Sequence, residues 1–285
     1  MRQLLVDLIE ENQNLPSFPD VVSRLEEELR KPTVSDRSVA DLIKSDASLV
    51  GRILQVANSA FYSSGRREVS TLTMAITRLG HKTIKELVYS LEFTKLFSKF
   101  TVIDHKRFWR HSIAVGVFAQ SLCRRLGFGI SEIENAYLAG LMHDVGVLVF
   151  LQLAPKEYGF FLGKVGSQRV SLPMREREYF DIDHAELGFR FMKKWWPVDD
   201  SVSQAVRDHH LPIDPRRTER EISDLVNVAN SICNYLDFDN GLDIYSNTFT
   251  ESVWLSIGVP LEQVEQLLEE VQESIRYAEE LVSVS

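Results

Sequence analysis

A histidine and an aspartate stand side by side in one of the most apolar stretches of the chain. His143 and Asp144 follow the run Leu138-Ala-Gly-Leu-Met142 and precede Gly146. Burying two such groups in an apolar core costs on the order of several kcal/mol unless they are hydrogen-bonded or bind a metal. We therefore expect a polar site at this point of the core.

Other histidines in the second half of the chain could join this pair. Imidazole and carboxylate groups are the usual ligands of iron, zinc and manganese, and helices can bring them to one interior point. Four more histidines fall on or at the ends of expected helices: His111, His184, His209 and His210. No two of them form a compact motif such as HExxH. The spacing alone thus leaves two readings open, because these histidines could also cap helix ends and bond backbone carbonyl groups. His81 and His105 fall near expected helix starts and are read as surface residues.

The hydrophobic periodicity predicts short helices in the first hundred residues and no alternating strand pattern. Gly80 is expected to end a helix, and Ser59–Ser70 is expected to be a loop. The expected helices are residues 1–15, residues 19–30 with Pro19 in the first turn, one after Ser35, one capped by Ser45 or Asp46, residues 70–79, and residues 81–98.

Helices must also position the histidines of the second half. A change in composition over Lys99–Lys106 suggests a boundary between two subdomains. The expected helices beyond it are 108–126 with His111, one capped by Ser131 that carries His143 and Asp144, 156–165, one that carries His184 and ends at Trp195-Trp196-Pro197, 199–210, 220–236 with Asn230, and an amphipathic segment over 260–283.

Bulk properties narrow the class of protein. The chain has 285 residues, is 44% hydrophobic and carries a net charge of −9, which fits a globular protein and argues against broad nucleic-acid binding. No apolar run approaches the roughly 18 residues of a membrane helix. Asp7, Glu10 and Glu11 interrupt any signal-peptide pattern. Cys123 and Cys233 form no CxxC motif, so we expect free, buried thiols in a reducing cytoplasm.

Short motifs in a fixed order carry a resemblance to a known family. They are Leu15-Pro-Ser-Phe-Pro19, Val56-Ala-Asn-Ser-Ala-Phe61, Ala75-Ile-Thr-Arg-Leu-Gly80, Gly140-Leu-Met-His-Asp-Val-Gly146, Asp183-His-Ala-Glu-Leu-Gly188, Trp196-Pro197 and Asp208-His-His210. Over about residues 13–236 the chain resembles the HD superfamily of metal-dependent phosphohydrolases. It resembles more closely the HDOD domain, a regulatory relative found in bacterial signalling proteins.

The resemblance implies an all-α fold with two lobes. Residues 1–100 would form the N-terminal helical lobe and residues 101–250 the HD-type lobe. Residues 251–285 would form an amphipathic helix with Leu261, Val264, Leu267, Leu268 and Val271 on one stripe. That helix could pack on the domain, lead into a further domain or support a homodimer.

The resemblance also implies a metal site with one or two ions of iron, manganese or zinc. Its ligands would be His111, His143, Asp144, His184, His209 and His210. Asn230 stands where the cyclic-dinucleotide phosphodiesterase branch has an aspartate ligand, and would be a weaker ligand or act from behind the ligands. Val147 stands where that branch has a phosphate-contacting lysine, and no Gly-Tyr-Pro segment follows His210. Asp181 stands where a glycine is common, shortly before the histidine that matches His184.

These departures favour a non-catalytic regulatory module of signal transduction. Its partners would be signalling proteins, such as sensor kinases, receiver domains or diguanylate-type domains, or a small anionic ligand. The alternative is a metal-dependent phosphohydrolase or cyclic-dinucleotide phosphodiesterase. Arg66-Arg67 and the basic stretch Lys164–Arg177 could bind an anion, although exposed charges more often form a solvated face.

Overall fold

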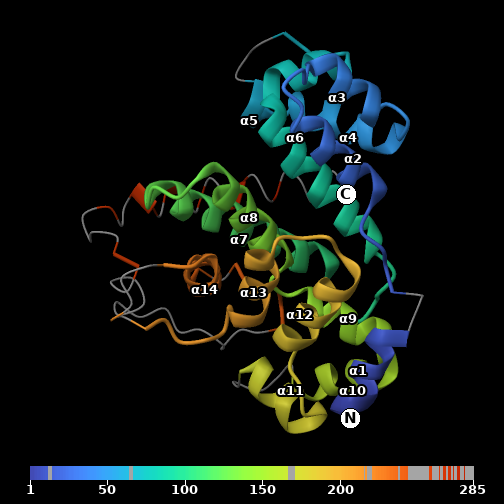
Figure 1. The fold of residues 1–285 in the computed structure, drawn as a ribbon, viewed down its shortest axis with the longest axis vertical. Coiled ribbons are helices and arrows are strands. Elements are labelled where there is room, and N and C mark those ends of the chain that lie inside the picture. The colour runs from blue at the N-terminus through green and yellow to red at the C-terminus, as the bar shows by residue number, and fades with distance from the viewer. Residues whose placement is uncertain are drawn as a thin grey trace. The chain divides into compact units, whose positions relative to one another are not determined.

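The computed structural model describes residues 1–11, 15–63, 67–165, 171–214, 216, 220–236, 238–242, 257–258, 263, 266–267, 269–270, 272, 275–276 and 279. These residues form fourteen α-helices, and no strand occurs among them (Figure 1). The predicted all-α class is confirmed. No single described helix is long and apolar enough to cross a bilayer. Among the described residues, only the pair Ile130–Met142 and Val145–Leu153, which is bent by 42°, meets that requirement by length and composition.

The helices group into two compact units. The smaller unit is Phe18–Ser98, and the larger unit joins Met1–Ser17 to Lys99–Arg276. The sequence places residues 1–17 in the first lobe, whereas here they belong to the larger unit. Two indole groups explain this, because Trp195 Nε1 donates a hydrogen bond to Ile9 O at 2.9 Å and Trp196 Nε1 donates one to Pro16 O at 3.0 Å. The predicted lobe boundaries at residues 100 and 250 stay predictions.

The smaller unit contains five helices: α2 (Asp20–Leu29), α3 (Asp36–Ile43), α4 (Ala47–Ala57), α5 (Ala60–Ser63) and α6 (Leu72–Leu96). Asp46 caps α4 by accepting a hydrogen bond from Leu49 N at 3.0 Å, which confirms one of the two expected caps. Pro19 is the N-cap of α2 and does not lie inside its first turn. The short helix α5 falls inside the segment expected to be a loop, so that prediction is wrong in part.

Gly80 divides α6 into the two helices that the sequence predicts. Its φ of +79° lies in a region that residues with a Cβ rarely adopt, and it is the one non-helical residue inside α6. Residues 72–79 and 81–96 therefore run in different directions on either side of this glycine.

The larger unit holds the remaining helices: α1 (Arg2–Glu11), α7 (His105–Arg125), α8 (Ile130–Met142), α9 (Val145–Leu153), α10 (Pro155–Val165), α11 (Leu172–Phe180), α12 (His184–Trp195), α13 (Asp200–Asp208) and α14 (Ile222–Tyr235). Helix α7 packs against α8 and α14, while α12 packs against α9 and α13 (Figure 1). Gly129 and not Ser131 caps α8, because the Glu132 carboxylate accepts the Gly129 N–H at 2.8 Å.

Helices α9 and α12 approach so closely that only glycine fits at their crossing. A Cβ on Gly146 would lie 1.8 Å from the carbonyl oxygen of His184 and 2.8 Å from the amide nitrogen of Gly188. The seven residues Val145–Leu151 of α9 are buried. This contact brings the start of α9, next to Asp144, against the start of α12, which is His184.

The predicted C-terminal amphipathic helix lies largely outside the described residues, including Leu261, Val264, Leu268 and Val271. Leu267 is described and is buried. Glu270 forms an ion pair with Arg125 of α7 and accepts a hydrogen bond from Ser121. These contacts are consistent with packing of this segment on the larger unit.

Candidate metal centre

Six side chains from five helix ends or helices converge inside the larger unit. His111 lies in α7, His143 and Asp144 form the junction between α8 and α9, His184 begins α12, and His209 and His210 follow α13. The sequence expects His143 and Asp144 within a helix, and the break at this point is a correction. All six are buried except His210, which is half-buried. The convergence is observed, and ligation of a metal by these residues stays a prediction.

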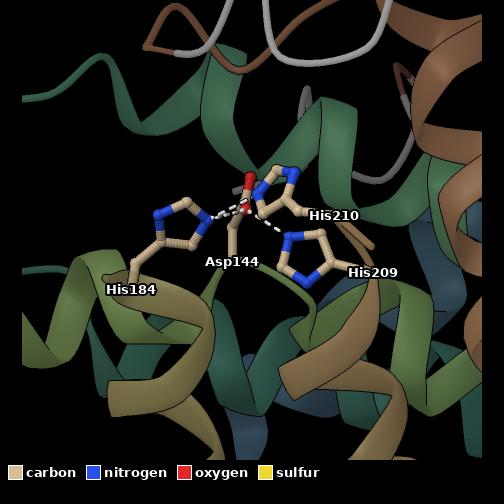
Figure 2. Close-up of side chains that lie close together, drawn as sticks. All are labelled: Asp144, His184, His209 and His210. Atoms are coloured by element: carbon tan, nitrogen blue, oxygen red, sulfur yellow. Dashed lines mark hydrogen bonds and ion pairs between the residues drawn. The ribbon is translucent and has the colours of Figure 1, made fainter. Parts of the chain in front are cut away.

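Asp144 is the centre of this cluster (Figure 2). Its Oδ1 lies 3.4 Å from His184 Nε2 and 3.5 Å from His209 Nε2, and its Oδ2 lies 3.1 Å from His143 Nε2. His184 Nε2 is 2.9 Å from His210 Nε2. Two groups of potential ligand atoms, each within 4.8 Å, share Asp144: one adds His184, His209 and His210, and the other adds His111 and His143.

Three of the imidazoles present unpaired nitrogens to the interior. Each Nδ1 lies 2.7 Å from a backbone carbonyl oxygen: His111 contacts Phe238 O, His143 contacts Gly140 O, and His209 contacts Val206 O. A carbonyl can only accept, so Nδ1 carries the proton and Nε2 of the neutral ring carries a lone pair. These three Nε2 atoms are buried without a hydrogen-bond partner. A buried lone pair is costly unless it is satisfied, and a metal ion satisfies it.

Glu176 of α11 holds the fourth imidazole. Its Oε2 accepts hydrogen bonds from His184 Nδ1 at 2.6 Å and from His184 N at 2.8 Å, and the Tyr158 hydroxyl donates to its Oε1. Glu176 is fully buried. A carboxylate behind a histidine fixes the ring and raises its basicity in many metal sites. The donor set therefore fits an iron, manganese or zinc ion.

Sequence reasoning missed Glu176, although a signal was present. Glu176 falls between Leu172 and Phe180 at the four-residue spacing of one helix face, and all three are buried. An acid on an apolar helical stripe needs a buried partner, and His184 is that partner.

Asn240 was also missed, and Asn230 takes part in a hydrogen bond within its own helix. Asn240 Nδ2 donates a hydrogen bond to Asp144 Oδ2 at 2.5 Å. Asn230 is buried in α14, and its Oδ1 accepts a hydrogen bond from Asn234 at 2.8 Å. A role for Asn230 as a weak ligand stays a prediction. Asn240 offered no signal, because it lies 96 residues from Asp144 in the chain.

The charges of the cluster favour a cation at Asp144. Burial alone would raise the pKa of Asp144, but attraction to His143 and the nearby ring nitrogens of His143, His184 and His209 hold the pKa well below its usual range. Burial opposes a charge on His184, yet the Glu176 carboxylate and Asp144 raise its pKa well above the usual range. The carboxylates of Glu176 and Asp144 therefore favour positive charge at this point of the interior.

Three other imidazoles of the cluster, those of His111, His209 and His210, resist protonation. Burial, followed by repulsion from His143, lowers the pKa of His111 to about 4. Burial also lowers the pKa of His209, and burial together with its neighbours His209 and His184 lowers that of His210 strongly. Neutral imidazole is the form that binds a metal.

A cavity of about 500 Å³ opens beside the cluster and shares His210 with it. Arg177 and Arg207 also line this cavity. Both guanidinium groups have carboxylate partners, because Arg177 pairs with Asp183 and Arg207 contacts Asp208 Oδ1 at 2.7 Å. A small molecule in this cavity would therefore meet the half-buried edge of the cluster.

Other residues highlighted in the sequence lie away from the cluster. His81 is 2.9 Å from Asp36 Oδ1 and His105 bonds Phe100 O, and both are half-buried, so the expectation that they are surface residues holds in part. Cys123 and Cys233 are free and buried, as expected. Arg66 and residues 166–170 of the basic stretch lie outside the described residues.

Comparison with known proteins shows the family of this chain. The HDOD domain pattern matches residues 15–212, so the chain belongs to the HDOD family. A curated relative, an uncharacterized protein of Treponema pallidum (strain Nichols), is 26% identical over 237 residues, which are 82% of this chain. The match covers 45% of that relative, so the chain spans less than half of its length.

Solved structures share the fold. An HDOD domain protein of unknown function from Geobacter sulfurreducens has a TM-score of 0.79 at 24% identity, over 98% of this chain and 97% of its own. A candidate phosphohydrolase from Shewanella amazonensis SB2B has a TM-score of 0.73 at 20% identity, over 98% of each chain. A candidate signal transduction protein from Marinobacter aquaeolei VT8 has a TM-score of 0.73 at 21% identity, over 99% of this chain and 65% of its own.

Proposed function

We propose that the chain is a regulatory module of bacterial signal transduction that binds a metal ion in its larger unit. It acts by binding a partner protein or a small anionic ligand and does not hydrolyse phosphodiesters efficiently. Its membership of the HDOD family and its likeness to a protein named for signal transduction support this role.

The metal would be held by the six converging side chains, and the unpaired Nε2 atoms of His111, His143 and His209 support this assignment. Glu176 orients His184, and Asn240 donates a hydrogen bond to Asp144 Oδ2. A bound ion would lower the pKa of a coordinated water and polarise a phosphoryl oxygen. The chain's own residues exclude bulk water from five of the six side chains, since only His210 is half-buried.

Val147 is the observation that carries the non-catalytic part of the proposal. It is fully buried in α9, three residues beyond Asp144, at the position of the phosphate-contacting lysine in the branch that this chain resembles. An apolar buried side chain cannot neutralise a phosphate charge. The two arginines that line the nearby cavity do not directly replace the positive charge of that lysine. Arg177 is paired with Asp183, and Arg207 is paired with Asp208.

The alternative function is metal-dependent hydrolysis of a phosphate ester. The retained cluster and the cavity that reaches His210 favour it, and one structural neighbour is named as a candidate phosphohydrolase. For the regulatory role, we expect the chain to act in the cytoplasm. Its partner would be a signalling protein, such as a sensor kinase, a receiver domain or a diguanylate-type domain, and the chain could form a homodimer.

The metal part is tested by elemental analysis of the purified chain. We expect stoichiometric iron, manganese or zinc in the wild type, and its loss in His143→Ala and Asp144→Ala. His81→Ala, in the smaller unit, is the matched control and should keep the ion. Wild-type protein without metal, in a preparation grown with all three metals, would contradict metal binding.

The non-catalytic part is tested with metal-loaded protein and cyclic-di-GMP. We expect no turnover beyond the rate of the Asp144→Ala variant. Metal-dependent turnover that Asp144→Ala abolishes would overturn the regulatory reading in favour of the enzyme.

A further inference from the structure

One face of α7 holds the segment that follows α14. Arg110 and His111 come three and four residues after Arg107, so the three side chains leave α7 on the same side. Each of them contacts residues 238–242, a segment that we call the strap. These contacts join the start of α7 to a part of the chain that begins 127 residues beyond His111.

The contacts between α7 and the strap include a buried charge. Phe238 O accepts a hydrogen bond from His111 Nδ1 at 2.7 Å, and the Arg110 guanidinium lies 4.1 Å from the centre of the Phe238 ring. Asp239 Oδ2 accepts a hydrogen bond from Arg107 at 2.7 Å, and the Asp239 side chain is 5% exposed. A buried carboxylate depends on its partner, because removal of the partner leaves an uncompensated charge. This pair therefore ties the strap to α7.

The strap also folds back on itself. Gly241 N donates a hydrogen bond to Asp239 Oδ1 at 2.6 Å, and Leu242 N donates one to Asn240 Oδ1 at 2.8 Å. The φ of Gly241 is +82°, which a residue with a Cβ rarely adopts. Asp239 thus uses one oxygen for Arg107 and the other for this turn, so loss of its charge weakens both.

Two of the six side chains of the cluster touch the strap. His111 Nδ1 donates to Phe238 O, which leaves Nε2 of that ring to carry the lone pair. Asn240 Nδ2 donates to Asp144 Oδ2 at 2.5 Å. Since Leu242 N donates to Asn240 Oδ1, the Asn240 side chain presents its NH₂ group to Asp144. The strap thus sets the tautomer of one imidazole and the orientation of the one carboxylate in the two groups of potential ligand atoms.

Contacts of this kind couple a segment to a bound ion. Groups that hold metal ligands from behind raise metal affinity by about 10- to 100-fold. Coupling is reciprocal, so the factor by which the seated strap raises the affinity for an ion is also the factor by which the ion stabilises the seated strap.

We propose that residues 238–242 are a strap that positions His111 and Asp144 for the ion and loosens when the ion leaves. Arg107 and Asp239 are positioning residues, because they act on the cluster through the strap. This inference rests on the proposed metal binding and names the segment that responds to it. A segment that loosens on metal loss lets a regulatory module present its metal content to a partner protein.

Loss of the Asp239 charge tests the positioning role. Asp239→Asn keeps the size of the side chain and weakens both the contact with Arg107 and the turn at Gly241. We expect about tenfold weaker binding of Mn²⁺, measured by competition with a chelator. Glu270→Gln is the matched control, because it removes the carboxylate partner of Arg125, another arginine of α7, and it should bind as the wild type does.

Glycine variants give a second test that leaves every charge in place. A Cβ on Gly241 would lie 3.2 Å from Arg107 Cδ, and the φ of +82° strains alanine. Gly241→Ala should therefore also weaken Mn²⁺ binding. Gly127→Ala is the control and should keep the wild-type affinity, since Gly127 has a similar φ of +77° but a Cβ there has no neighbour within 4 Å.

Hydrogen exchange of backbone amides tests the response of the strap to the ion. The N–H groups of Phe238, Gly241 and Leu242 are hydrogen-bonded in the structure. We expect them to exchange about tenfold faster after chelation of the metal, by the same factor as in the affinity test. Amides in the middle of α7 serve as the internal reference and should change less.

Two outcomes would overturn the proposal: wild-type Mn²⁺ affinity in a folded Asp239→Asn, or strap amides whose exchange the ion changes no more than that of α7. The absence of any ion from the wild type would overturn the proposed metal binding and the coupling with it. The two failures are therefore distinguishable, and Gly241→Ala decides the matter if Asp239→Asn does not fold.

Discussion

Glu176 supports the cluster through a single imidazole. Both hydrogen bonds that it accepts on Oε2 come from His184. In Glu176→Gln the negative charge is lost, so the ring becomes less basic and less firmly oriented. We expect a loss of metal affinity of about 10- to 100-fold, measured by competition with a chelator. Glu178→Gln, whose carboxylate pairs with Arg175 at the surface, is the control and should bind as the wild type does. Equal affinity in both variants would show that Glu176 serves only packing.

The two thiols give a second prediction for single residues. Burial raises the pKa of both Cys123 and Cys233 to about 12. The thiolate is the reactive form, so at pH 8 neither thiol should react with a disulfide reagent in the folded protein. In denaturant both should react at once, with two thiols counted per chain. Rapid modification of one thiol in the native protein would contradict this expectation.

Gly146 governs the crossing of α9 and α12. A methyl group there would overlap His184 O and Gly188 N, which are backbone atoms and cannot rotate away. We expect Gly146→Ala to lose at least about 3 kcal/mol of the free energy of unfolding. It should also lose metal, because the crossing places Asp144 near His184. Chemical denaturation measures the first effect and elemental analysis the second.

Gly163 of α10 is the matched control for this prediction. It is exposed, and a Cβ added there has no neighbouring atom within 4 Å. Gly163→Ala should therefore be neutral or gain about 0.5–1 kcal/mol, because alanine favours the helix. A similar loss in both variants would mean that the crossing has no special demand for glycine.

Local signals explain which elements the sequence could predict. Gly80 and Asp46 act within a few residues of themselves, so the break in α6 and the start of α4 follow from the chain alone. The cap of α8 was predicted at Ser131, because serine is a common capping residue. In the structure the Glu132 carboxylate accepts the Gly129 N–H instead, and the type of residue alone does not decide between these two starts of the helix. The histidines were found through their type, whereas Asn240 depends on a contact that only the folded chain creates.

At the scale of the whole molecule, each compact unit buries its own core, and the cluster lies entirely in the larger one. A ligand stabilises only the folded state that binds it. We expect a chelator to lower the unfolding temperature of the larger unit and to leave that of the smaller unit unchanged. Differential scanning calorimetry measures both, and His209→Ala, without chelator, should reproduce the chelator's effect. A uniform shift of the entire thermogram would contradict this assignment.

His210 belongs at once to the cavity wall and to the cluster, where its Nε2 is 2.9 Å from that of His184. An occupant of the cavity and an ion at Asp144 would then be thermodynamically linked, each altering the affinity of the other by the same factor. Such reciprocity would let the chain report the presence of a small molecule through its metal, or the supply of metal through a small molecule, without any bond being cleaved.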